Sequence, residues 1–444
     1  MERPNPSRVL VVGLASSGLA AARLAAADGA SVVVNDRRSS DELADRASQL
    51  PGEAVRVFGS HPSSCLDGVD LVVVSPGVPR DLELLQDAAE RAIPVLSEVE
   101  FAWRHRADAT LVAVTGSNGK STVTTIVADM LRASGVATAA GGNLGPPASE
   151  LVLDGGWHTW VLEISSFQSE TFQLFRPTIG VFLNLSQDHL ERHPDLTSYA
   201  AAKARLFARQ QTPDVAVFNA DDPLVLETAT SVPRMLFSVN GIADAHLDGE
   251  VLRLGDEALL ERRELKLAGR HNVANALAAA LAARSAGASL DGIRQTLRQF
   301  PGLAHRHQVV CEHDGVRWID DSKATNIGAT LAALGGYADG AVHLILGGLG
   351  KGQDFQQLAN EVSRAAAHVY LIGKDAKEIG RALGAVTRED CETLEVAVAQ
   401  ARANATAGQV VLLAPACASF DQYPNYTERG RHFARLAREV AACH

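Results

Sequence analysis

The sequence lacks the cysteine spacings that hold metals or disulfide frameworks. Its five cysteines are scattered, and no two form a C-x-x-C pair. We therefore predict neither a zinc site nor disulfides, and a reducing cytoplasm fits this usage. Long hydrophobic runs are also missing, because Gly13, Gly18 and Arg23 interrupt the apolar stretch near the start. No charged n-region or cleavage site accompanies that stretch, so we expect neither a secretory leader nor membrane insertion.

Basic residues are too few for sequence-independent binding of polyanions such as nucleic acids. The chain has 41 Lys and Arg against 52 Asp and Glu, a net charge of −11. This balance argues against a nucleic-acid or anionic-membrane surface, so a few local groups must hold any anionic ligand. At 444 residues, 46% hydrophobic and 21% charged, the sequence indicates a globular α/β protein of two or three domains.

One stretch predicts a nucleotide triphosphate site. Residues 115–122 read T-G-S-N-G-K-S-T directly after the apolar run 111–114. A strand that breaks into a glycine-bearing loop and then a helix points several backbone N–H groups at one spot, which suits phosphate. Lys120 supplies a cation, and Ser121 or Thr122 a hydroxyl for Mg²⁺. The spacing is shorter than the usual P-loop, and the alternative is a glycine-rich turn with a solvated lysine.

The start of the chain has the pattern of a Rossmann-type βαβ unit. We expect a strand at 8–12, a turn at 13–18, a helix at 19–28 and a strand at 31–34 that ends near Asp36. NAD binding is one interpretation. However, Ala15 stands at the second glycine position, where a side chain hinders a pyrophosphate. We therefore predict another nucleotide ligand, held by Ser16, Ser17, Arg37 and Arg38, with a second turn at Ser75-Pro76-Gly77 on the same sheet edge.

Polar side chains follow two further apolar strands in the middle of the chain. Glu163 ends the run W-V-L-E-I-S-S-F-Q, where it could reach the Mg²⁺ of a nucleotide or merely cap a turn. Asp188 and His189 follow the strand 179–183. Since these groups and the P-loop fall on one sheet edge, a shared metal site is plausible.

Two helical segments carry further candidates. Lys203 lies among alanines in the stretch 199–209. A neutral amine beside a cation can add CO₂ and become an anionic metal ligand, but the residues alone favour a solvated helical lysine. Asn272 and Asn275 stand near the start of an alanine-rich helix, where asparagine either caps the helix or reads an adenine edge.

After a hinge near 300–306 the strand and helix rhythm restarts. Apolar strands at 317–319, 342–346, 368–372 and 410–413 each lead into a polar loop, which predicts a second parallel sheet. The loops carry Lys323, Thr325, Lys351 and Ser419, which could grip a dianionic substrate. Cys417 lacks a local Cys-His signature, and we interpret it as a small buried residue.

Several motifs together resemble the Mur ligases of peptidoglycan synthesis over nearly the whole chain. They are the short P-loop, E-I-S-S-F-Q, D-H-L-E-R-H, G-R-H-N-V-A-N-A, G-L-A-H-R, D-D-S-K-A-T-N, G-G-L-G-K-G and A-C-A-S-F-D-Q-Y, in the family's order. The resemblance implies three α/β domains: a Rossmann-like domain at 1–98, a central P-loop domain with a parallel sheet at 99–302, and a Rossmann-like domain at 303–444.

The resemblance also implies an activity. The enzyme would use ATP to join D-glutamate to UDP-N-acetylmuramoyl-L-alanine (UDP-MurNAc-L-Ala) through an acyl phosphate, with two Mg²⁺ ions and a carbamylated Lys203. We expect a cytoplasmic monomer whose partners are these small molecules. L-glutamate, another amino acid or a folate-type glutamyl chain are alternative acceptors. A dinucleotide sensor or P-loop switch without ligase chemistry is an alternative of another class.

Carried over by position, the resemblance assigns roles to individual residues. ATP would contact the P-loop, including Gly116, Ser117, Asn118, Gly119, Lys120, Ser121 and Thr122, together with Asn275, Arg306 and Asp321 at a domain boundary. The metals would be held by Ser121, Glu163, His189 and Lys203. The uridine substrate would contact Ser16, Ser17, Arg37, Arg38, Gly77, Asn143, Ser165 and His189. D-glutamate would contact Lys323, Thr325, Lys351, Ser419 and Tyr426. The catalytic set would be Lys120, Asn143, Glu163, His189 and Lys203.

Two departures bear on these roles. The turn with Ala15 and Ser16 differs where relatives vary, which affects the uridine contacts. Tyr426 stands where Phe is common, so its hydroxyl is an addition.

Overall fold

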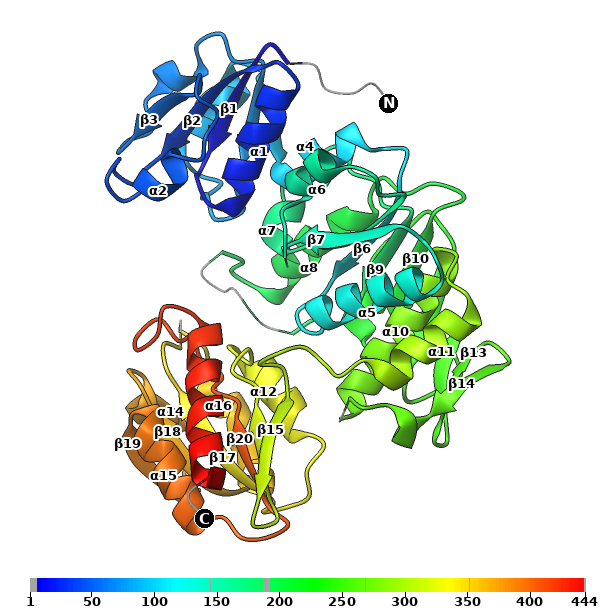
Figure 1. Cartoon of the computed structure of the whole chain (residues 1–444), viewed down its shortest axis with the longest axis vertical. Helices are drawn as coiled ribbons and strands as arrows, with labels where there is room; N and C mark the ends of the chain where they lie inside the picture. Colours follow the sequence, from blue (N-terminus) through cyan, green and yellow to red (C-terminus); the bar gives the residue numbers. More distant parts are fainter. Residues whose placement is uncertain are drawn as a thin grey trace. The chain divides into compact units, whose positions relative to one another are not determined.

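The computed structural model describes residues 6–143, 145–186, 188, 192–267, 269–350 and 352–442. The chain forms two compact units. One comprises Met1–Leu185, Thr197–Leu260 and Asn275–Leu297, and the other Ser186–Leu196, Glu261–Ala274 and Arg298–His444. Three separate sheets define three α/β domains, labelled in Figure 1. Within the described ranges, no helix combines the length and apolar character that a bilayer crossing requires.

The first domain is a five-stranded parallel sheet in the order β3-β2-β1-β4-β5. The predicted strand 8–12 is confirmed, whereas the helix begins at Ser16 rather than at residue 19. Gly18 lies inside this helix. The position requires glycine, because a Cβ there would lie 1.9 Å from Gly13 O. The elements are β1 Arg8–Val12, α1 Ser16–Ala27, β2 Ser31–Asp36, α2 Ala44–Ala47, β3 Val55–Phe58, η1 Ser63–Leu66, β4 Leu71–Val74, α3 Glu83–Glu90 and β5 Val95–Ser97.

The middle domain is built on a nine-stranded sheet in the order β14-β13-β12-β11-β10-β9-β6-β8-β7. The strands from β7 to β12 in this order run parallel, and β13 turns back antiparallel to β12. The strands are β6 Thr110–Thr115, β7 Thr138–Gly142, β8 Thr159–Glu163, β9 Ile179–Phe182, β10 Val215–Asn219, β11 Arg234–Ser238, β12 Ala245–Asp248, β13 Val251–Leu254 and β14 Glu257–Glu261.

Helices connect these strands and follow them. Helix α5 buries Val123, Ile126, Val127, Met130 and Leu131, the spacing of one helical face. The helices are α4 Glu98–His105, α5 Lys120–Ala133, α6 Ala148–Asp154, α7 Ser166–Ser169, α8 Leu196–Ala204, η2 Arg205–Phe207, α9 Pro223–Leu226, η3 Arg262–Glu264, α10 Arg270–Ser285 and α11 Leu290–Gln299.

The last domain has a six-stranded sheet in the order β15-β16-β20-β17-β18-β19. The predicted parallel strands are present, but β15 is an antiparallel edge strand that the sequence analysis did not anticipate. The elements are β15 Gln308–His313, β16 Val316–Asp320, α12 Ile327–Leu334, β17 Val342–Gly347, η4 Phe355–Leu358, α13 Ala359–Ala365, β18 Ala366–Ile372, α14 Ala376–Ala382, β19 Arg388–Glu392, α15 Leu394–Asn404, β20 Val410–Leu413 and α16 Tyr426–Ala442.

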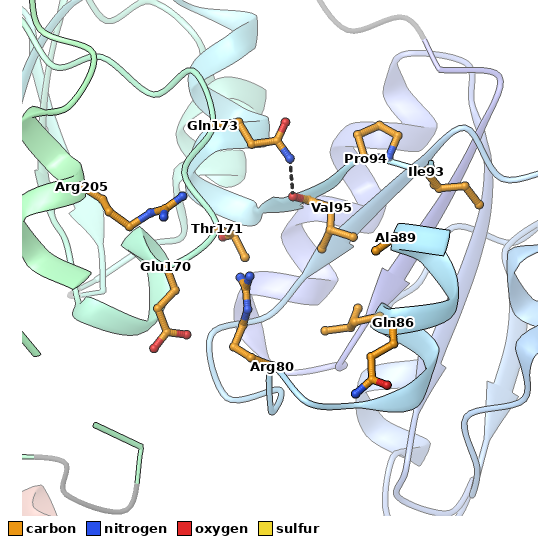
Figure 2. Close-up of a pocket in the computed structure, with 11 residues that line it drawn as sticks. Arg80, Gln86, Ala89, Ile93, Pro94, Val95, Glu170, Thr171, Gln173 and Arg205 are labelled. Atoms are coloured by element: carbon orange, nitrogen blue, oxygen red, sulfur yellow. Dashed lines mark hydrogen bonds between the residues drawn. The ribbon is translucent and has the colours of Figure 1, made fainter. Parts of the chain in front are cut away.

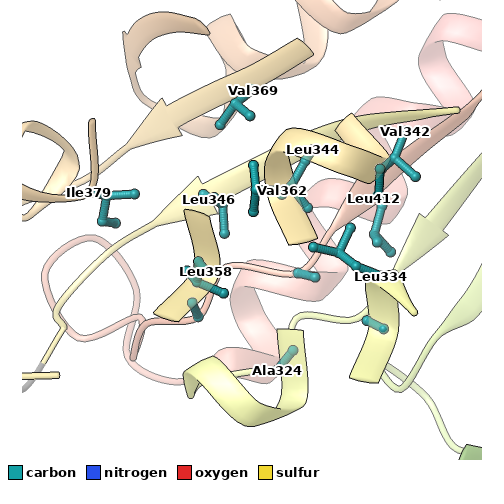
Figure 3. Close-up of a cluster of buried hydrophobic side chains, with 14 of the residues drawn as sticks. Ala324, Leu334, Val342, Leu344, Leu346, Leu358, Val362, Val369, Ile379 and Leu412 are labelled. Atoms are coloured by element: carbon teal, nitrogen blue, oxygen red, sulfur yellow. The ribbon is translucent and has the colours of Figure 1, made fainter. Parts of the chain in front are cut away.

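Buried aliphatic side chains cover both faces of this last sheet. Leu344, Leu346 and Leu412 point to one face and meet Leu358 and Val362 from the helical segments (Figure 3). On the other face, Trp318 packs against Phe433 of α16 with ring centroids 6.2 Å apart. Strands buried on both faces read as continuous apolar runs, which is why they were recognisable in the sequence.

Helix α4 joins the first domain to the middle domain through two buried glutamates. Glu100 accepts hydrogen bonds from the N–H groups of Gln173 and Leu174 at 2.7 and 2.8 Å and pairs with Arg104 at 2.6 Å. One carboxylate oxygen of Glu98 accepts a hydrogen bond from the Ser149 N–H at 2.5 Å, whereas the other oxygen is buried without a hydrogen-bond partner. Burial raises the pKa of Glu98 to about 7, against that hydrogen bond.

This asymmetry predicts opposite effects of two matched substitutions. The pKa of Glu98 rises from its ordinary value of 4.5 to about 7 on folding. Between these two pH values the unfolded chain releases a proton that the folded chain retains, so the folded state loses stability as the pH rises. Glu98→Gln should therefore stabilise the protein by about 3 kcal/mol at pH 8, an advantage that shrinks toward pH 5. Glu100→Gln should destabilise it at both pH values.

Thermal unfolding midpoints of the three proteins at pH 5 and pH 8 measure this. A pH-independent effect of Glu98→Gln would contradict the account.

Candidate functional site

The P-loop lies where the sequence places it, between β6 and α5. Gly119 has φ +83°, a left-handed conformation that favours glycine. A Cβ there would lie 2.4 Å from Asn275 Oδ1, so the loop also needs glycine to admit the asparagine. Asn275 is buried within α10 rather than at its cap, which removes the capping interpretation for this residue. The structure therefore brings two of the predicted ATP contacts together.

Asn184 fastens the P-loop to the neighbouring strand. Its backbone oxygen accepts from the Ser117 N–H at 3.0 Å, and its side chain exchanges hydrogen bonds of 2.8 and 3.0 Å with the backbone of Asn118. Sequence reasoning missed this residue. Its position directly after the predicted strand 179–183 was the available signal, since polar residues at strand ends line such sites.

Two lysines share one carbonyl oxygen of the P-loop. Lys120 Nζ donates to Gly116 O and Ser117 O at 2.8 Å each, and Lys203 Nζ donates to Gly116 O at 2.8 Å. Lys203 is 1% exposed and also lies 4.4 Å from the centre of the Tyr199 ring. The interpretation of Lys203 as a solvated helical lysine is therefore wrong. Two ammonium groups gathered on one loop favour a ligand with several negative charges.

Glu163, at the end of β8, connects the P-loop helix α5 to the residue that follows β7. Its carboxylate accepts from Ser121 Oγ at 2.5 Å and from Asn143 Nδ2 at 2.6 Å, and the residue is 3% exposed. The Asn143 N–H also donates to Glu163 O at 2.9 Å. This close approach requires Gly142, where a Cβ would meet Glu163 O at 2.5 Å. Glu163 thus reaches the P-loop, rather than only capping its own turn.

The donors around Glu163 fit Mg²⁺. A hydroxyl and a buried carboxylate are hard oxygen ligands, and Mg²⁺ usually takes one or two carboxylates and completes its shell with water and phosphate. Among the described residues, no three His, Cys, Asp or Glu side chains cluster as a metal site. A protein-only cage is therefore not formed by that part of the chain. Of the two further predicted metal ligands, Lys203 bonds to Gly116 O, and His189 lies outside the described residues.

The edge of the first sheet is organised by Asp36. Its carboxylate accepts from the Leu14 N–H at 2.7 Å and pairs with Arg38 at 2.6 Å. Burial acts to raise the pKa of Asp36, but hydrogen bonds from Arg38 and Leu14 outweigh it and lower the pKa to about 2. The acid that would hold the ribose of NAD in a dinucleotide fold is thus occupied within the protein.

Four further predicted uridine contacts with described positions, besides Asn143 and Arg38, follow elements of the same unit or begin one, and Ser165 is a fifth. Ser16 and Ser17 open α1, whose N-cap Ala15 offers no side-chain hydrogen bond. Gly77 is exposed in the turn after β4, and Arg37 follows β2. Ser165 caps α7 in a reciprocal pair with Gln168, so its hydroxyl already has a structural role.

Of the predicted amino-acid contacts that are described, Lys323, Thr325 and Ser419 lie on loops of the last sheet, and Tyr426 begins α16. Lys323 Nζ lies 4.1 Å from the centre of the Tyr426 ring, a cation–π contact. Ser419 is 2% exposed, and Thr325 is partly buried in the loop after β16. Lys351 lies outside the described residues, so its predicted role stays a prediction.

Arg306 and Asp321, the two ATP contacts predicted in the last domain, lie near a cluster formed by His271 and His307. Asp321 Oδ2 is 3.5 Å from His307 Nδ1, and His307 Nε2 bonds to the Tyr337 hydroxyl at 2.8 Å. His271 faces His307. Burial, and to a lesser extent the charge of His307, lower the pKa of His271 to about 4. Arg306 lies in the same loop as His307, partly buried.

A separate cavity of about 410 Å³ is lined by α3 and β5 of the first domain and, in the middle domain, by the segment that follows α7 and by Arg205 of η2. Figure 2 shows Arg80 and Glu170 directed toward it and Gln173 bonded to Val95 O at 3.1 Å. None of the described residues predicted for the site lines this cavity. It is therefore distinct from the P-loop region.

Three family models match successive parts of the chain. They are the Mur ligase MurD-like N-terminal domain at residues 7–97, the Mur ligase middle domain at 114–283, and the Mur ligase glutamate ligase domain at 305–417.

Named relatives resemble the chain over almost its full length. A UDP-N-acetylmuramoylalanine–D-glutamate ligase of Anaeromyxobacter dehalogenans is 44% identical, with 98% of each chain covered. The protein of the same name from Escherichia coli K12 is 42% identical, covering 97% of this chain and 98% of its own. The solved UDP-N-acetylmuramate-alanine ligase of Thermotoga maritima shares the fold, with a TM-score of 0.61, 20% identity, and 98% and 99% coverage. The chain belongs to the Mur ligase family.

Proposed function

We propose that the protein is an ATP-dependent ligase that joins D-glutamate to UDP-MurNAc-L-Ala for peptidoglycan synthesis. The names of the relatives, at 42–44% identity over nearly the whole chain, support this activity. The observation that carries it is the gathering of Lys120, Lys203 and the Ser121–Glu163 pair around one P-loop. We place the domain boundaries at 98 and 302 and propose a cytoplasmic monomer.

The reaction must first bring two anions together. The carboxylate of the alanyl group attacks the γ-phosphorus of ATP, a C–O–P bond forms, and the bond to the bridging oxygen breaks to release ADP. Lys120 would hold the γ-phosphate oxygens by exchanging its hydrogen bonds to the carbonyls of Gly116 and Ser117 for bonds to phosphate. Backbone N–H groups of the loop and of the start of α5 would orient the same phosphates.

The second step forms the amide bond. The uncharged amine of D-glutamate attacks the acyl phosphate carbon, and the tetrahedral intermediate expels phosphate. Lys323, Thr325, Lys351, Ser419 and Tyr426 would bind the two carboxylates of the amino acid, while Asn143 would lie near the acyl phosphate. Asn275, Arg306 and Asp321 would hold ATP, and Ser16, Ser17, Arg37, Arg38, Gly77, Ser165 and His189 the uridine substrate.

Metal binding belongs to the same proposal. Ser121 and Glu163 would hold one Mg²⁺, and His189 with a carbamylated Lys203 a second. Bound Mg²⁺ would neutralise phosphate charge and so lower the repulsion between the reacting anions. The Lys203 amine bonds to Gly116 O, and a carbamate keeps one N–H with which to retain that bond while its oxygens gain negative charge.

The activity itself is measured by phosphate release with ATP, Mg²⁺ and UDP-MurNAc-L-Ala. Release should depend on D-glutamate and exceed the rate with L-glutamate at least about 100-fold, because one enantiomer places both carboxylates and the amine correctly. Equal rates with both enantiomers, or none above the control without amino acid, would overturn the assignment.

Lys120→Ala should lower turnover at least about 100-fold, because a charge that stabilises the transferring phosphoryl group is lost. Binding of UDP-MurNAc-L-Ala, measured by calorimetry, should change less than about 2-fold, since the affinity arises mainly elsewhere. Lys377→Ala, at an exposed lysine of α14, is the matched control and should retain full activity. Equal loss of substrate binding in Lys120→Ala would refute this division of roles.

The carbamate has its own test. Protein equilibrated with ¹³C-bicarbonate should show one carbamate carbon resonance that disappears in Lys203→Arg, a variant that keeps the positive charge. Activity of this variant should fall at least about 100-fold. A fully active wild-type enzyme without that resonance would exclude carbamylation as a requirement.

A further inference from the structure

The last helix contains one arginine that is buried while its neighbours are exposed. Arg429, in the first turns of α16, is 1% exposed, whereas the side chains of Arg431 and Arg435 are 66% and 63% exposed. Burial lowers the pKa of Arg429 to about 10. A cation is costly to desolvate, so its retention inside the domain requires compensating hydrogen bonds.

Those bonds bridge two loops. Arg429 Nε donates to Ser322 Oγ at 3.0 Å, and Nη2 donates to Ser322 O at 2.9 Å and to Cys417 O at 3.0 Å. Ser322 follows β16 and Cys417 follows β20, which are adjacent strands. One planar guanidinium thus fixes the spacing between the loop of Lys323 and Thr325 and the loop of Ser419.

A third loop is held by the second loop rather than by Arg429 itself. A Cβ on Gly348, directly after β17, would lie 2.3 Å from Ala418 O, so glycine lets these two loops approach each other. This loop is joined to the second one, because Leu349 and Ala418 exchange backbone hydrogen bonds of 2.9 Å in both directions. The loop leads directly to Lys351.

Other residues of α16 contact the loop after β16, which carries Ser322 and Lys323. The Ser322 hydroxyl donates to Tyr426 O at 2.8 Å, and the Tyr426 ring receives Lys323. Gly430 leaves room for the His305–Asp320 pair, since a Cβ would lie 2.8 Å from Asp320 Oδ2. Asp320 in turn accepts from the Ser322 N–H at 2.9 Å.

We propose that Arg429 is a positioning residue for the amino-acid substrate, holding the loops after β16 and β20 in one arrangement, to which the loop after β17 is joined through Leu349 and Ala418. It acts through these loops and does not itself touch substrate. The inference rests on the proposed function in that these loops carry the residues assigned to D-glutamate. Lysine cannot reproduce the arrangement, because a single ammonium group lacks the planar fork that reaches both Ser322 and Cys417.

Steady-state kinetics of Arg429→Lys and Arg429→Met provide the test, with Arg431→Met as the matched control on the same helix. Both Arg429 variants should raise KM for D-glutamate at least about 10-fold, the methionine variant more, while KM for ATP and for UDP-MurNAc-L-Ala changes less than about 3-fold. The control should match the wild type. A general folding defect would instead lower kcat and leave the three KM values unchanged.

Hydrogen exchange separates this inference from the proposed function. In Arg429→Lys, amides of residues 322–325, 348–350 and 417–420 should exchange at least about 10-fold faster, while those of the P-loop remain unchanged. This result would support the positioning role even if the wild type had no activity with D-glutamate. Unchanged exchange in these loops, or equal increases throughout the last domain, would overturn it. If Arg429→Met does not fold, Arg429→Lys alone decides.

Discussion

The site depends on the carbonyl oxygen of Gly116, which accepts hydrogen bonds from both Lys120 and Lys203. Two like charges on one acceptor repel each other, so the arrangement is tolerable only where negative charge is near. Glu163, linked to the same helix through Ser121, supplies one such charge inside the protein. The loop is therefore preorganised for a polyanion, and much of the electrostatic work of bringing phosphate to a carboxylate is already done by the fold.

Close backbone approaches hold this arrangement in place. Gly119 admits the side chain of Asn275, Gly142 admits the backbone oxygen of Glu163, and Gly348 admits the backbone oxygen of Ala418. In each case the smallest residue lets a polar group from another element approach the loop. The two predicted ligand regions thus share one feature, a polar atom packed against a glycine at the carboxyl end of a parallel strand.

Much of this was readable from the sequence because its signals are local. The P-loop, the strand that ends in Glu163 and the strands of the last domain are contiguous patterns. The burial of Lys203 was not readable, since a lysine flanked by alanines gives no sign of the face that packs. Arg429 was equally hidden among the arginines of an amphipathic helix. The antiparallel strand β15 was missed because its alternation is weak and its partner is set by tertiary pairing.

The strand order of the last sheet has a consequence for how the chain reaches its native state. Strand β20 pairs with β16 on one side and β17 on the other, although roughly ninety residues separate it from β16 in sequence. Until β20 arrives, both neighbours present unpaired edges to solvent. This domain therefore completes its sheet only by inserting a distant strand between two others, and such long-range pairing is a topology that slows folding.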